Sequence, residues 1–275
     1  MSNITASEVN KLRKATGAGM MDCKNALVEA NGDFELAIEN LRKKGQKVAA
    51  KRADRDSSEG AVIAMVNDDQ TKGVIISLNC ETDFVAKNES FVDLAKSFCK
   101  IALNCSSLDE LLNSTHESSM TVSDKLIEQT GVIGEKLEIG AFESVSSEHV
   151  GFYIHAGNKI ATLAGLSNKF ENVSDVSKNV AMQVAAMNPI ALNEDSVSKE
   201  IIEKEIEIAK EQLRAEGKPE AMLDNIAKGK LKKFFKENTL VKQAYIKDNK
   251  SSVENYIQSE NNECFITDFK RVALV

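Results

Sequence analysis

The residues that could perform chemistry are few and widely spaced. Cys80 and His155 could form a thiol–imidazole nucleophile pair, but five scattered cysteines make a chance pairing easy, and no third residue is evident to orient the histidine. The three histidines (His116, His149 and His155) have no metal-ligand spacing with one another or with cysteine. The chain contains neither a GxxxxGK(S/T) loop nor a GxGxxG turn after a strand, the two common phosphate cradles. The sequence therefore predicts no catalytic residue, no metal site and no cofactor.

Two short segments carry side chains suited to contact with another molecule. Asp83 and Phe84 follow the end of a predicted strand, where a Phe more often covers a core and an Asp more often caps a helix. Met20 and Met21 follow a glycine-rich turn at the start of a predicted helix, where they either fill a core or form an adaptable contact patch. Spacing alone leaves these alternatives open.

Composition limits the class of protein. The chain has 275 residues, of which 42% are hydrophobic and 28% charged, as in ordinary soluble globular proteins. A net charge of −7 argues against nucleic acid as the main partner, although a local basic patch is compatible with an acidic total. The five cysteines lack a CxxC spacing and fit reduced, partly buried thiols. Without a signal-peptide pattern at Met1 to Thr5 or an apolar run of about 20 residues, we expect a cytoplasmic protein.

The first part of the chain predicts three helices. Thr5 and Glu8 have the spacing of a capping box, and Gly17 is expected to end the first helix. The second helix carries Met21, Cys23, Ala26, Leu27 and Ala30, and Asn31 and Gly32 are expected to end it. Asp33 caps the third helix, which we expect to end at Gly45, and the charged residues 47–56 read as a linker.

The middle of the chain shows one pattern twice. Two β-rich runs, 61–66 and 73–78, are joined by a polar turn and followed by a helix with Phe91 and Phe98 on its apolar face. Runs 149–155 and 159–166 repeat this order, with a helix that carries Val173 to Met187. A further strand is expected near 137–145. This pattern predicts two similar αβ halves.

A charged segment follows from Ser196. Ile202, Ile206, Ala209 and Leu213 have helical spacing, Gly217 to Pro219 interrupt the run, and a second stripe returns through Met222, Leu223, Ile226, Leu231 and Phe234. This pattern predicts an antiparallel helical hairpin that projects from the body, since so narrow a stripe leaves most of each helix solvated.

Five segments resemble signature sequences of the bacterial elongation factor Ts family, and they occur in the family's order from near residue 1 to about residue 270. They are Leu12 to Leu27 (LRKATGAGMMDCKNAL), Asn79 to Asn88 (NCETDFVAKN), Tyr153 to Gly157 (YIHAG), Met182 to Ala186 (MQVAA) and Gln243 to Asp248 (QAYIKD). Two long signatures in the right order are highly specific.

The resemblance implies an α+β fold. It comprises an N-terminal three-helix domain like the ubiquitin-associated domain (UBA-like) at 1–55 that binds a GTPase, and a two-part αβ core of antiparallel hairpins plus helices at 56–145 and 146–275, with the helical hairpin inserted at about 196–238. It also implies guanine-nucleotide exchange on elongation factor Tu, in its GDP-bound and nucleotide-free forms, without covalent chemistry. No direct contact with nucleic acid or a membrane is implied. The hairpin would mediate a homodimer or a 2:2 complex, or else pack on the core.

Site residues follow from the resemblance alone. Thr82, Asp83, Phe84 and Val85 would displace Mg²⁺ from the partner, with Phe84 as a wedge between GTPase helices. The residues that would bind the partner are Arg13, Met20, Met21, Lys24 and His155, with Ile133 and Ile246 as weaker candidates. A purely structural adaptor and a thiol enzyme are the competing hypotheses.

Overall fold

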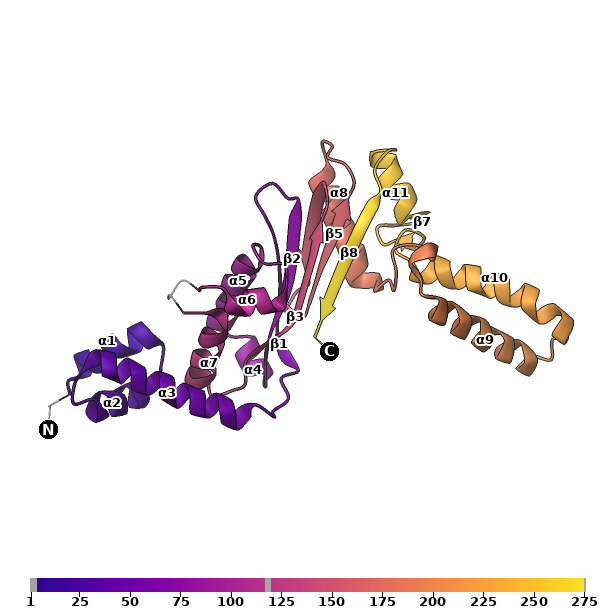
Figure 1. The fold of residues 1–275 in the computed structure, drawn as a ribbon. Coiled ribbons are helices and arrows are strands. Elements are labelled where there is room, and N and C mark those ends of the chain that lie inside the picture. Colours follow the sequence, from indigo (N-terminus) through magenta and orange to yellow (C-terminus); the bar gives the residue numbers. More distant parts are fainter. Residues whose placement is uncertain (1–3, 117–119, 275) are drawn as a thin grey trace.

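The computed structural model describes residues 4–116 and 120–274. In this part of the chain, helices and antiparallel sheets combine in an α+β fold. The N-terminal helices lie at one end, the sheets lie in the middle, and a pair of long helices lies at the other end (Figure 1). No helix among the described residues is both long and apolar enough to cross a membrane.

The elements follow in chain order. The helices are α1 (Ala6–Thr16), α2 (Met20–Glu29), α3 (Phe34–Arg52), α4 (Asp83–Ala86), α5 (Glu89–Ala102), α6 (Leu108–Asn113), α7 (Val122–Ile133), α8 (Val173–Met187), α9 (Lys199–Ala215), α10 (Glu220–Asn238) and α11 (Val253–Glu260), with a 3₁₀ turn at Glu194–Ser196. The strands are β1 (Glu59–Val66), β2 (Lys72–Cys80), β3 (Glu138–Ser146), β4 (His149–Ile154), β5 (Ile160–Leu166), β6 (Ala244–Tyr245), β7 (Asp248–Ser252) and β8 (Ile266–Ala273).

Local signals set the ends of the first helices as predicted. The Thr5 hydroxyl accepts from the Glu8 N–H, while the Glu8 carboxylate accepts from the Thr5 N–H at 2.7 Å, which completes the capping box of α1. Gly17 closes α1 with φ of 71°, a left-handed conformation that glycine adopts without strain. Asp33 caps α3 through the Leu36 N–H. Residue type and contacts between residues close in the sequence therefore account for these three helix ends.

Helix α3 corrects one prediction. Gly45 does not end the helix, which continues to Arg52, so residues 47–52 are helix and not linker. Gly45 is buried because α3 crosses α7 at Gly131: a Cβ added at Gly131 would lie 2.4 Å from the Gly45 Cα, and one at Gly45 would lie 3.3 Å from the Ile127 carbonyl oxygen. A glycine inside a helix is unfavourable by about 1 kcal/mol relative to alanine, which this close backbone contact offsets. We call this contact the Gly45–Gly131 crossing.

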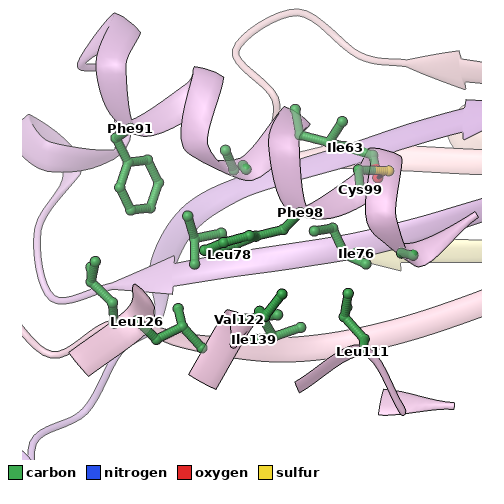
Figure 2. Close-up of a cluster of buried hydrophobic side chains, with 14 of the residues drawn as sticks. Ile63, Ile76, Leu78, Phe91, Phe98, Cys99, Leu111, Val122, Leu126 and Ile139 are labelled. Carbon is green, nitrogen blue, oxygen red and sulfur yellow. Dashed lines mark hydrogen bonds between the residues drawn. The ribbon is translucent and has the colours of Figure 1, made fainter. Parts of the chain in front are cut away.

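The two predicted strand pairs are confirmed, and each gains a third strand. The two three-stranded sheets have the orders β1-β2-β3 and β4-β5-β8, and β6 and β7 form a separate small sheet; all these pairs are antiparallel. Helix α5 packs on the first sheet and α8 on the second. In Figure 2, Phe98, Ile76 and Leu78 meet in the core between the first sheet and its helices.

The opposite faces of the sheets pack against each other. Val62 and Ile75 of the first sheet join Val150 and Leu163 of the second in one buried cluster. Gly73 permits the close approach, since a Cβ there would lie 2.7 Å from a Leu163 methyl carbon. The fold therefore consists of two sheets back to back, with helices on the outside.

Helices α9 and α10 lie antiparallel and extend away from the sheets (Figure 1). Ala209 and Leu213 of α9 are buried, as are Leu223 and Ala227 of α10. Met222, which we expected on the buried stripe, is instead 51% exposed because Leu223 and Ala227 form the contact row.

Candidate partner-binding site

The Thr82–Val85 segment forms a short turn directly after β2. Thr82 is the N-cap of α4, a single helical turn, and Asp83 is its first residue rather than its cap. Val85 packs against the core of the first sheet, and Ala86 is buried. Phe84 points outward and is 84% exposed, the largest exposed fraction among the described large apolar side chains. The alternative in which Phe84 covers the core is therefore wrong.

One carboxylate holds the start of this turn. Glu135 follows α7 and receives three hydrogen bonds from two consecutive residues. The N–H groups of Glu81 and Thr82 donate to its Oε2 at 3.1 Å and 3.0 Å, and the Thr82 hydroxyl donates to Oε1 at 2.6 Å. We call this arrangement the Glu135 clamp. The Thr82 hydroxyl thus faces the protein and does not cap α4.

A second carboxylate joins this turn to α3. Glu81 accepts from Arg52 Nη1 at 2.7 Å and from the Lys136 N–H at 2.6 Å. The pKa of Glu81 lies below its usual value, chiefly because the Lys136 N–H donates to the ionised form and further because Arg52 is close. The last turn of α3 is therefore tied to the strand end that precedes Phe84.

Asp83 is charged and partly exposed to solvent, with 45% of its side chain accessible. Its carboxylate accepts from Lys87 Nζ at 2.6 Å, one helical turn further on, and this contact lowers the pKa of Asp83. Exposed pairs of this kind contribute little to stability and break easily. Asp83 is therefore available to another molecule at small energetic cost.

The structure disfavours the thiol-enzyme hypothesis, because Cys80 and His155 each have a different hydrogen-bond partner. Burial, with the Glu135 carboxylate nearby, raises the pKa of the Cys80 thiol to about 12, so the nucleophilic thiolate is scarce at neutral pH. Cys80 donates to the Thr82 carbonyl, whereas His155 contacts the Tyr153 hydroxyl at 3.1 Å. All five cysteines are buried free thiols. Within residues 4–116 and 120–274, no group of three potential metal ligands occurs.

The N-terminal candidates form an exposed surface where α1 ends and α2 begins. Met20 is 56% exposed and Met21 is 64% exposed, so the core-filling alternative is wrong for both. Arg13 and Lys24 are also exposed. We call these four residues the methionine surface.

Two further candidates share one depression. His155 and Ile246 both line a cavity of about 220 Å³ with Met182. Buried Gln183 fixes the segment that carries Ile246, because its Oε1 accepts from the Ile246 N–H at 2.8 Å and its Nε2 donates to the Ala244 carbonyl. Gln183 lies in one of the signature segments, but its residue type and spacing predict no role for it. Ile133 is half-buried against the core of the first sheet and does not belong to this depression.

The His155 turn lies at the same end of the sheets as the Thr82 turn. Glu59 pairs with Cys80 in the β1–β2 register and forms an ion pair with Lys159 of the β4–β5 turn. The Asn158 carbonyl accepts from the Val62 N–H at 2.7 Å. Sequence reasoning missed Glu135, because it lies 53 residues from Thr82 and no local pattern connects them.

Comparison with known proteins gives one consistent result. Residues 81–274 match the family described as "Elongation factor TS". Over the whole of both chains, the sequence is 66% identical to an elongation factor Ts from Christiangramia forsetii and 63% identical to one from Flavobacterium psychrophilum. It is 50% identical to one from Amoebophilus asiaticus, over 98% of each chain.

Proposed function

Because the chain belongs to the elongation factor Ts family, we propose that it is a guanine-nucleotide exchange factor for elongation factor Tu in translation elongation. It would bind the GDP-bound partner, displace Mg²⁺ and promote release of GDP so that GTP can bind. The observation that carries the proposal is an almost fully exposed Phe84 on a turn that is anchored on both sides.

The mechanism needs no covalent chemistry. A GTPase holds GDP largely through the phosphates and a bound Mg²⁺. A protein that binds the nucleotide-free state more tightly than the loaded state must weaken nucleotide binding by the same factor. Displacement of a helix that supports the metal site would produce this antagonism.

Phe84 would supply the larger part of the energy. Transfer of an exposed Phe side chain into an apolar environment is favourable by about 1.5–3 kcal/mol. Asp83 would disturb the groups that support Mg²⁺, but exposed charges are screened within about 10 Å at 0.1 M salt. We therefore assign the main effect to insertion of Phe84, with Val85 and Thr82 as the supports of its turn.

The methionine surface would supply affinity. Met side chains are flexible and polarisable, so Met20 and Met21 can adapt to an apolar patch on the nucleotide-binding domain of the partner. Arg13 and Lys24 would add cationic contacts beside them. His155 would contribute from the depression that it shares with Ile246, and Ile246 and Ile133 remain the weaker candidates.

We extend the proposal to the domain organisation. Residues 1–55 would form the UBA-like domain that binds the GTPase, 56–145 and 146–275 the two parts of the core, and the hairpin at about 196–238 a contact in a homodimer or 2:2 complex. The protein would act in the cytoplasm without a cofactor.

Release of a fluorescent GDP from purified elongation factor Tu tests the proposal. We expect micromolar protein to accelerate release strongly over the spontaneous rate. Unchanged release would overturn the exchange function, and stable binding without acceleration would favour the structural adaptor.

A further inference from the structure

The geometry around Thr82 shows how a very short helix keeps one shape. Helix α4 has four residues, and a single helical turn is unstable alone because nucleation fixes several backbone angles for one hydrogen bond. Its conformation must therefore come from contacts outside it. On its C-terminal side these are the packing of Val85 and Ala86 on the core.

On its N-terminal side the contact is the Glu135 clamp. Two consecutive backbone N–H groups converge on one carboxylate oxygen, an arrangement that suits an anion. The Thr82 hydroxyl binds the second oxygen at 2.6 Å. Phe84 lies between these two anchors and remains exposed.

The chain around Glu135 is itself fixed. Gly134 ends α7 with φ of 82° and redirects the chain toward the end of β2. Asn79 and Glu138 then pair in the β2–β3 register. The Lys136 N–H donates back to the Glu81 carboxylate, so the two segments exchange hydrogen bonds in both directions.

We infer that Glu135 is a positioning residue for nucleotide exchange: its carboxylate holds the Thr82–Phe84 backbone in the one shape that presents Phe84 to the partner. This inference rests on the proposed function. Without the carboxylate, the Glu81 N–H, the Thr82 N–H and the Thr82 hydroxyl lose their shared acceptor. The Thr82–Val85 turn must then become ordered each time the protein binds its partner, which costs free energy. The hydrogen bonds that Glu135 accepts all come from Glu81 and Thr82, so its loss removes no hydrogen bond from the four residues of the methionine surface.

The test compares Glu135→Ala with Glu135→Gln and with Glu143→Ala as the matched control. Glu143 is a half-buried strand carboxylate that pairs with Lys270 at 3.6 Å, away from the turn. Glu135→Gln retains the contacts, because its amide oxygen can accept from both N–H groups and its NH₂ can donate to the Thr82 hydroxyl.

In the GDP-release assay, we expect Glu135→Ala to lower the maximal rate at saturating protein about tenfold, which equals about 1.4 kcal/mol, the net contribution of about one hydrogen bond once water satisfies the freed donors in part. The concentration for half-maximal rate should stay within about twofold, since initial binding depends on other contacts. Glu135→Gln should recover most of the rate, and Glu143→Ala should match the unmodified protein.

Hydrogen exchange on the free protein separates positioning from the exchange function. Residues 81–86 should exchange faster in Glu135→Ala and not in Glu143→Ala. If Glu135→Ala is too unstable to purify, Thr82→Val, which removes one donor, and Thr82→Ser, which keeps it, make the same comparison.

Three results would overturn the inference: a normal maximal rate in Glu135→Ala, unchanged protection of residues 81–86, or equal defects in Glu135→Gln and Glu135→Ala. If the unmodified protein fails to accelerate release, the proposed function is wrong, and the hydrogen-exchange comparison still decides whether Glu135 orders the turn.

Discussion

The Thr82–Val85 turn and the methionine surface are built in opposite ways. The turn has one exposed aromatic side chain on a backbone fixed by the Glu135 clamp and by the core. The methionine surface has two flexible side chains at the start of α2. The N-cap of this helix is Gly19, which has no side chain that could form a capping hydrogen bond. A rigid wedge suits displacement of a partner's helix, while adaptable side chains suit binding that must persist as the partner changes shape. We therefore expect the turn to govern the rate of nucleotide release and the methionine surface to govern affinity.

The largest expected effect is that of Phe84→Ala. The maximal rate of GDP release should fall by about 10- to 100-fold, which corresponds to the transfer energy of a Phe side chain. The melting temperature should stay unchanged, because Phe84 is 84% exposed. Phe265→Ala is the matched control, since Phe265 is 62% exposed elsewhere. A lower melting temperature with normal exchange would identify Phe84 as a structural residue.

The Gly45–Gly131 crossing joins α3 of the N-terminal helices to α7, which leads to Glu135. Gly131→Ala places a Cβ 2.4 Å from the Gly45 Cα, so we expect a loss of about 1–3 kcal/mol in the free energy of unfolding. Gly229→Ala in α10 meets no atom within 4 Å and should stabilise the protein by about 0.5–1 kcal/mol. Urea denaturation of both variants measures the difference. Equal stabilities would show that the crossing adapts without strain.

Replacement of Met20 and Met21 should weaken binding of the partner without slowing the maximal rate of GDP release. We expect Met20→Ala with Met21→Ala to raise the protein concentration for half-maximal GDP release by about three- to tenfold, with the maximal rate preserved. Met187→Ala, which removes a methionine that is 45% exposed at the end of α8, is the control. A reduced maximal rate with an unchanged half-maximal concentration would reverse the roles assigned here.

The smallest expected effect concerns the link between α3 and the turn. The folded pKa of Glu81 is lowered, so its contribution to stability is complete above the unfolded value near 4.5 and disappears as pH falls through the folded pKa. Glu81→Gln should therefore lower the free energy of unfolding by roughly 1 kcal/mol at pH 7. The difference from the unmodified protein should vanish in acid. Urea denaturation at several pH values measures it, and a difference independent of pH would exclude the carboxylate as its cause.

Local features of the fold could be predicted from the sequence, and long-range ones could not. The capping box at Thr5, the cap at Asp33 and both strand pairs depend on neighbouring residues and were correct. Gly45 was misread as a helix end because its role depends on Gly131 of another helix. A glycine has the same sequence signal in either role.

The candidate site also combines local features, which the sequence predicts, with long-range contacts, which it does not. The family resemblance implies a role for Thr82 to Val85, but spacing alone could not distinguish an exposed Phe84 from a buried one. Glu135 and Gln183 act through contacts with segments more than 50 residues away, so no local pattern could identify them. Residues that hold a site in place are found from geometry.

Thermodynamic coupling tests the central claim most directly. The affinity of elongation factor Tu for GDP is measured with and without saturating amounts of each variant, which gives the factor by which the two ligands weaken each other. We expect Phe84→Ala to bring this factor close to one. Met20→Ala with Met21→Ala should leave the factor unchanged once elongation factor Tu is saturated with the variant. An unchanged factor in Phe84→Ala would contradict the account.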